Sequence, residues 1–235
     1  MKLNNIFYTL KVVIFLFIIG STKISQAQVD YGWDNQIYLG NKITFGKNEW
    51  KFSGELQTRM KDDFQSLDNW YIEFVSNYFY SERIEIVPDF RYTIKPGKFE
   101  FRPGIGILYK KTIHNVHYVN QIKYQMDIST LGDISHAFRE VIFLNYPFND
   151  KIVGTTVAGF IYKKRSNWNG FQYIRVGPGV TYLFDQQHSL NFSYFIGVEN
   201  KTDGWLWAGI PMVQLVISIS NQSDYKYMPA YYFNF

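Results

Sequence analysis

Two serine–histidine neighbours are the residues of this chain whose types could do hydrolytic chemistry. Ser135 precedes His136, and Ser189 follows His188; a serine activated by a histidine is the nucleophile of many acyl hydrolases. Adjacent side chains of a β-strand point to opposite faces, so neither pair can form the required contact within one strand. A serine and a histidine from different strands could still meet at the rim of a barrel. A lipid-modifying hydrolase is therefore an alternative function.

Metal and cofactor chemistry has little support. The chain has no cysteine, which excludes disulfides, thiolate metal sites and cysteine nucleophiles. His114 and His117 have a spacing that suits a helix more than a strand, and their surroundings indicate a turn. Gly104-Ile105-Gly106 lacks the third glycine and the following helix of a dinucleotide site. We expect no metal, no cofactor and no catalytic residue, and a protein that is not an enzyme.

Alternation with period two dominates the chain after residue 30. Between Trp50 and Arg59, a largely apolar face alternates with a polar one that begins at Lys51, and the pattern recurs over residues 83–94, 116–128 and 189–198. Such strands suit either a soluble sandwich with its apolar faces inward or a membrane barrel with its apolar faces outward.

Several features favour the barrel. The polar faces carry both signs of charge in mid-strand, and the segments are longer than is usual in a sandwich. Tryptophans lie near the expected strand ends, where aromatic rings prefer the membrane–water interface; they are Trp50, Trp70, Trp168, Trp205 and Trp207. A soluble periplasmic β-barrel or sandwich that binds a small ligand is the remaining alternative.

We expect an all-β chain that forms an antiparallel transmembrane β-barrel of 10–12 strands. The expected strands are residues 36–45, 49–59, 70–80, 83–94, 97–111, 115–128, 136–146, 151–163, 170–183, 187–199, 204–220 and 227–235. With both termini in the periplasm, the longer connection 60–69 would lie on the periplasmic side and the tight turn 46–48 outside, the reverse of the usual arrangement. One strand or boundary is therefore expected to be wrong.

Residues 1–27 are expected to be a signal peptide, which makes residues 28–235 the barrel. Lys2 and Lys11 precede an apolar run that is too short to span a membrane, and small residues come before the expected cleavage after Ala27. Loss of the leader brings the mature chain close to neutral, which disfavours a nucleic-acid partner. We expect the cell outer membrane as the location and its lipid as a partner. The aromatic ending 231–235 resembles the C-terminal signal for barrel insertion, so Phe235 is expected to engage the insertion machinery.

An internal echo raises a second functional hypothesis. Residues 101–109 align with residues 174–182 and share an arginine, two glycines and a tyrosine. The glycines would either let each strand bend or clear a pocket in which Arg102 and Arg175 meet a small anionic solute. The wider set of residues expected to face the lumen has mixed charge with a modest basic excess: Lys51, Arg59, Arg83, Arg91, Arg102, Lys110, Lys123, Arg139 and Arg175 against Glu55, Glu73, Glu85, Asp89, Glu100 and Asp127. Because an unpaired buried charge is costly, we expect these groups to pair and constrict the lumen.

The chain resembles an exported outer-membrane barrel family known as domain of unknown function 2490. The resemblance covers most of the chain after the leader and lies in short hairpins such as residues 45–50, arginines at Arg59 and Arg91, the segment 136–140 and the aromatic ending. The resemblance implies a barrel in the outer membrane, and the family has no assigned activity to carry over. The sequence thus predicts a narrow pore, or a plugged barrel with a structural or binding role.

Overall fold

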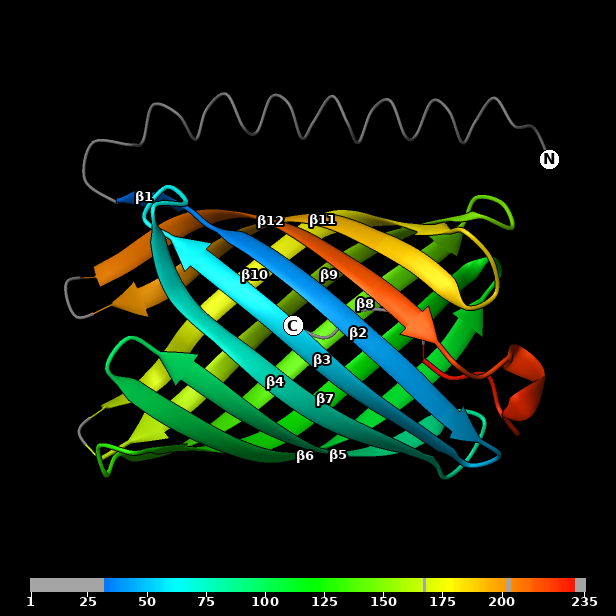
Figure 1. The fold of residues 1–235 in the computed structure, drawn as a ribbon, viewed down its shortest axis with the longest axis horizontal. Coiled ribbons are helices and arrows are strands. Elements are labelled where there is room, and N and C mark those ends of the chain that lie inside the picture. The colour runs from blue at the N-terminus through cyan, green and yellow to red at the C-terminus, as the bar shows by residue number, and fades with distance from the viewer. Residues whose placement is uncertain (1–31, 167, 202–203, 231–235) are drawn as a thin grey trace.

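In the computed structural model, the described residues are 32–166, 168–201 and 204–230. Long strands follow one another with short turns between them (Figure 1). They are β1 (Trp33–Asn35), β2 (Ile37–Lys47), β3 (Trp50–Lys61), β4 (Ser66–Phe79), β5 (Ile84–Lys95), β6 (Lys98–Ile113), β7 (Val116–Ser129), β8 (Ile134–Pro147), β9 (Ile152–Arg165), β10 (Trp168–Leu183), β11 (His188–Lys201) and β12 (Gly204–Ser218), before the 3-10 helix η1 (Gln222–Asp224). No helix among the described residues is long and apolar enough to cross a membrane.

The sheet closes on itself through a parallel pair. Each strand from β2 to β12 pairs antiparallel with the next, while β1 and β2 pair in succession with β12, so they share one position in the wall. The barrel therefore has eleven positions, and Figure 1 shows β2 and β12 ending side by side. The prediction of a closed barrel within 10–12 strands is confirmed, but the even count was wrong. Strands that alternate in direction can close through a parallel pair only when their number is odd, and the closing pair of β2 and β12 is parallel.

The last predicted strand accounts for the difference. Residues 227–230 are not a strand, and residues 231–235, with the expected insertion signal, lie outside the described residues. Since β2 and β12 run in the same direction, the wall begins and finishes at opposite ends of the barrel. We call the end where β12 finishes the tail end and the other the far end.

The turns at both ends of the barrel are short. The predicted long connection 60–69 was wrong: β3 continues to Lys61 and β4 starts at Ser66, which leaves a turn of residues 62–65. That turn places Asp62, Asp63 and Phe64 at positive φ, where carboxylate side chains are better tolerated than most others. The turn between β3 and β4 therefore projects little beyond the end of the barrel.

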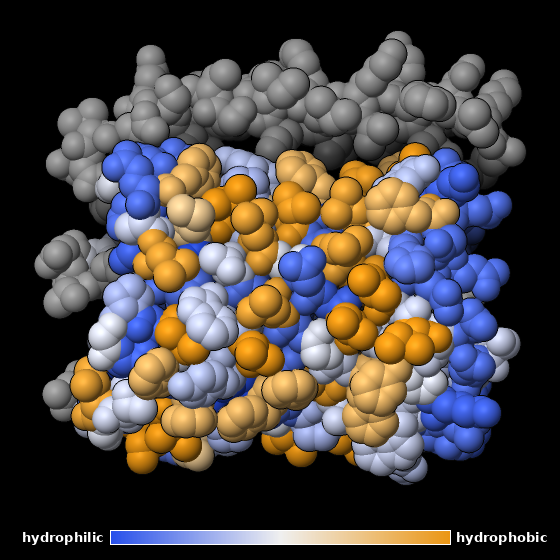
Figure 2. Space-filling model, viewed as in Figure 1, coloured by the Kyte–Doolittle hydropathy of each residue, from blue (hydrophilic) through white to orange (hydrophobic). Residues whose placement is uncertain are grey.

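The two faces of the wall have opposite character. The exposed outer side chains are largely apolar, among them Leu39, Phe74 and Ile105, and Figure 2 shows this apolar belt, with hydrophilic residues gathered at the tail end. The inner positions are buried and mostly polar. An apolar outside around a polar inside is the pattern of a barrel whose solvent is lipid.

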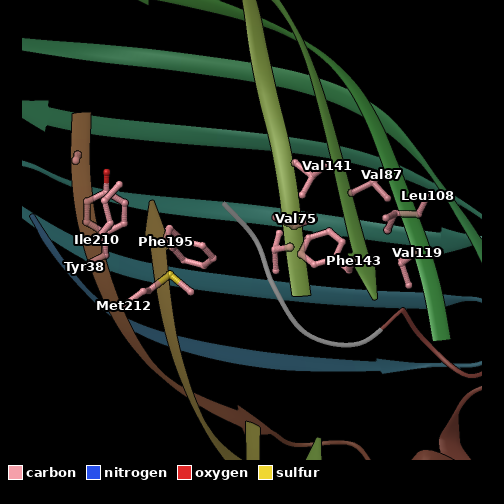
Figure 3. Packing of buried hydrophobic residues seen from close by; sticks show 12 residues of the cluster. Tyr38, Val75, Val87, Leu108, Val119, Val141, Phe143, Phe195, Ile210 and Met212 are labelled. Atoms are coloured by element: carbon pink, nitrogen blue, oxygen red, sulfur yellow. The ribbon is translucent and has the colours of Figure 1, made fainter. Parts of the chain in front are cut away.

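An apolar cluster also lies inside the barrel. Tyr38, Phe195, Ile210 and Met212 lie together on the inner faces of β2, β11 and β12 (Figure 3). A second group from β4 to β9 includes Val75, Val87, Leu108, Val119, Val141, Phe143 and Val157. These side chains fill space that would otherwise be open to water.

A glycine tests how tightly the inner wall is packed. A Cβ at Gly177 would overlap the carbonyl oxygen of Tyr194 and lie 2.8 Å from the Cα of Phe195. We expect Gly177→Ala to lower the free energy of unfolding by about 1–3 kcal/mol, because backbone must move to admit the methyl group. Gly54→Ala is the control, since its Cβ would meet the Phe74 ring at 3.8 Å. Urea unfolding of the refolded protein measures both, and equal midpoints would contradict the tight contact.

Candidate functional site

The inner faces of the strands hold the charged residues that the sequence singled out. Arg83 is an exception, because it lies exposed in the turn before β5 rather than inside. The structure places the others at buried or partly buried inner positions: Lys51, Glu55, Arg59, Glu73, Glu85, Asp89, Arg91, Glu100, Arg102, Lys110, Lys123, Asp127, Arg139 and Arg175. Lys163 belongs with them, although it was not predicted as a site residue; strict alternation along β9 would have shown its inward direction.

A four-residue network joins β4, β5 and β7. Arg91 donates from Nε and Nη2 to the two carboxylate oxygens of Glu73, each at 3.1 Å. Lys123 lies 2.6 Å from Asp89 Oδ1 and 3.8 Å from Glu73 Oε1. Both carboxylates are therefore neutralised within the barrel, and all four side chains are at most 4% exposed.

Glycines on β6 allow Lys123 to reach across the wall. β6 lies between β5 and β7, and a Cβ at Gly104 would lie 2.6 Å from Lys123 Cε and 2.9 Å from Asp89 Oδ1. A Cβ at Gly106 would meet Lys123 Cβ at 3.3 Å. The glycines of the first echo copy thus make room for the Lys123–Asp89 pair.

A second network neutralises Arg102. Asp127 on β7 forms ion pairs with Arg102 on β6 and with Lys163, which reaches it from β9. Arg102 therefore has a carboxylate partner, unlike its counterpart in the second echo copy. The two echo arginines thus have different electrostatic surroundings.

Arginines and tyrosines stack in the same interior. The Cζ of Arg91 lies 3.9 Å from the centroid of the Tyr71 ring, and that of Arg59 lies 4.4 Å from the Tyr38 ring. The Cζ of Arg175 lies 4.2 Å from the Tyr173 ring centroid and 5.4 Å from that of Tyr38. Stacking on aromatic rings offsets part of the cost of burying these cations.

Two buried arginines retain unpartnered nitrogen atoms. Arg139 is 4% exposed, and neither its Nε nor its Nη2 has a hydrogen-bond partner; Arg175 is 7% exposed, and its Nη1 has none. Gly197 on β11 makes the space for Arg175, because a Cβ there would lie 2.8 Å from Arg175 Cγ. Among the described residues, these are the only arginines with unpartnered buried nitrogens.

The chain beyond β12 folds back into the tail end of the barrel; we call residues 219–230 the tail segment. Ala230 donates its backbone N–H to Glu85 Oε1 at 2.8 Å, and Lys110 Nζ donates to the carbonyl oxygen of Met228 at 2.6 Å. Tyr225 packs edge-on against Phe79, with 5.8 Å between ring centroids. The segment is therefore anchored to buried inner residues.

The sequence predicted a strand over residues 227–235 and gave no sign that the tail segment enters the barrel. Pro229 was the available signal, because proline cannot donate to a β-ladder and is confined to strand edges, first positions and bulges.

Beside the segment is a cavity of about 550 Å³ at the tail end, whose lining includes Lys42, Lys51, Tyr225 and Pro229.

The serine–histidine pairs do not form hydrolytic sites. Ser135 is buried while His136 is exposed on the other face, where its Nδ1 lies 2.6 Å from the Tyr124 hydroxyl. His188 pairs with Asp185 at 2.9 Å. Asp185 also accepts the backbone N–H groups of Gln187 and His188, and these hydrogen bonds lower the pKa of its carboxyl group. Asp185 is therefore committed to stabilising its own turn. No group of three potential metal ligands occurs among the described residues.

Comparison with known proteins places the chain in a family. A search of curated proteins finds no match. A solved structure of the NanC porin shares 7% identity, with a TM-score of 0.46 over 70% of this chain and 87% of that chain. The family model described as Protein of unknown function (DUF2490) matches residues 34–208. That match spans β2 to β11 completely, all but the first residue of β1 and the first five residues of β12, and the chain belongs to the DUF2490 family.

Proposed function

We propose that the protein is a narrow, normally closed channel of the outer membrane and that its tail segment is the gate. The leader-like N-terminus, the apolar outer wall and the polar interior support this location. The ion-pair networks and the apolar cluster narrow the interior, and the tail segment occupies the tail end.

The anchor of the tail segment is the observation that carries the proposal. Glu85 also accepts from Asn77 Nδ2 at 2.8 Å and pairs with Lys110 at 2.7 Å. If the segment left, Glu85 would keep both of these partners, so release would not strand a buried charge. Because Glu85 stays paired whether the tail segment is bound or released, the barrel can adopt both a closed and an open state.

A cross-link tests the gate directly. Lys226 of the tail segment lies 3.3 Å from Glu49 Oε1, and the chain has no native cysteine. We expect the unmodified protein to show opening steps in planar bilayers. In Glu49→Cys/Lys226→Cys joined by a short bifunctional thiol reagent, these steps should be absent. The two single-cysteine variants, treated alike, should conduct as before.

The result also separates the alternatives. Equal conductance with and without the cross-link would reject the gate. A folded protein that never conducts, with or without the tail anchor, would reject the channel and leave a plugged barrel with a structural or binding role. Lipid hydrolysis has the weaker support, since the hydrogen-bonded partners of His117, His136 and His188 are Thr112, Tyr124 and Asp185 rather than a serine.

A further inference from the structure

The unpartnered atoms of Arg139 form one edge of its guanidinium group. Nε and Nη2 lie side by side, so their N–H groups form the planar fork that binds a carboxylate through two parallel hydrogen bonds. Arg91 uses this same edge to hold both carboxylate oxygens of Glu73. The barrel thus contains one occupied arginine fork and one of the same chemistry without a partner.

The acidic side chains near the Arg139 fork are committed elsewhere. Glu73 is held by Arg91, and Asp89 by Lys123. Lys123 lies directly opposite Arg139 on the neighbouring strand, so a second positive charge adjoins it. Most buried polar groups in native proteins have a partner, and one without needs an explanation.

Arg175 and Tyr173 complete the surroundings. In the register of β8, β9 and β10, Arg139 and Tyr173 both lie opposite Ile161, one on each side of β9. Tyr173 is within electrostatic range of Arg139, Arg175, Arg59 and Arg102. Glu199 offsets part of the charge of Arg175, whereas Glu73 and Asp89, which act on Arg139, are already paired with Arg91 and Lys123.

We propose that the Arg139 fork binds the carboxylate group of a small organic anion inside the barrel, with Arg175 adding positive charge from β10. The inference deepens the proposed channel, on which it rests for the route by which the anion reaches the interior. A planar fork distinguishes a carboxylate from a spherical halide, whereas a single ammonium charge does not. The site therefore predicts selectivity for carboxylates over chloride as well as affinity for anions.

Saturation-transfer NMR of the refolded protein in detergent, with acetate as the probe, tests the site without requiring conduction. We expect saturable acetate binding that an equal concentration of chloride does not abolish. Arg139→Lys keeps the charge but removes the fork, so acetate binding should weaken about tenfold or more. Arg139→Gln should lose it. Arg102→Gln is the matched control: it makes the same charge change at an arginine whose carboxylate partner keeps Lys163, so acetate binding should persist.

Each outcome decides the assignment. Absent or unsaturable acetate binding, or equal binding by Arg139→Gln, overturns it, and tighter binding of inorganic phosphate than of acetate overturns the choice of a carboxylate. Heat-dependent gel mobility verifies that each variant is a closed barrel, and Arg139→Lys provides a second variant if Arg139→Gln does not fold. Acetate binding without conductance would reject the channel but keep the site, whereas conductance without acetate binding would do the reverse.

Discussion

Replacing Glu73 with glutamine should lower the free energy of unfolding by about 3–5 kcal/mol, the range for breaking a buried ion pair from one side. Glu73 is 2% exposed and accepts both hydrogen bonds of the Arg91 fork. Glutamine has nearly the same shape, but it leaves the Arg91 charge buried without a counter-charge and removes an attraction on Lys123. Urea unfolding of the refolded barrel in lipid vesicles gives the measurement.

Two further variants separate this effect from a general sensitivity of the barrel. Glu73→Gln/Arg91→Met removes both charges and should recover much of the loss, because no isolated ion remains. Glu49→Gln breaks the exposed pair with Lys226 and should cost less than about 1 kcal/mol. A loss for Glu73→Gln as small as that for Glu49→Gln would show that water reaches Arg91 and that the network is not dry.

The architecture of the wall could be predicted because it depends on local pattern. Alternation fixes which side chains face in and which face out, and a one-residue error would reverse both faces. The strand containing Lys123 and Asp127 illustrates this, since both were predicted to face inward and lie buried. Arg83 was misplaced because it is the last residue of the turn before β5, and alternation has no meaning outside the strand.

The pairing inside the barrel could not be predicted, because it depends on the register of several strands at once and includes partners two strands apart, such as Lys123 and Asp89. Arg102 and Arg175 occupy equivalent places in the internal echo, yet only Arg102 finds a carboxylate, with Lys163 joining from two strands away. Likewise, Arg91 pairs with Glu73, whereas Nε and Nη2 of Arg139 have no hydrogen-bond partner. Composition shows a basic excess, but the register of the whole sheet decides which arginines remain without partners.

The prediction of a strand over residues 227–230 was wrong for another reason. The alternation that suggested a strand over residues 227–235 lies in residues 231–235, outside the described residues; for residues 227–230, the eleven-position wall already closes through β2 and β12. Closure removes the free edge that a further strand would need, so the segment instead turns towards Glu85 and Lys110. The even-number rule for bacterial barrels supported the wrong count here.

Removing the anchor of the tail segment should open the barrel. In Glu85→Gln/Lys110→Met, the donor to the Met228 carbonyl is lost and the acceptor for the Ala230 N–H becomes neutral. Because both charges are removed together, neither member of the Glu85–Lys110 pair is left as an unpaired ion. Each charge-assisted hydrogen bond contributes about 1.5–3 kcal/mol, so the ratio of open to closed states should rise by about tenfold to a hundredfold or more.

Single-channel recording in planar bilayers measures that ratio, and the far end of the barrel offers a matched control. Lys95→Met/Glu100→Gln removes the 2.8 Å ion pair between these residues at the far end, together with the 3.1 Å pair of Glu100 with Lys98, and should leave the open fraction unchanged. If both double variants opened the barrel alike, general loosening of the wall would explain the conductance. If neither did, the tail segment would be a fixed part of the interior, and the buried networks alone would close the lumen. Opening by the first variant only would identify the Glu85–Lys110 pair as the latch, because the two variants differ in whether the removed pair contacts the tail segment.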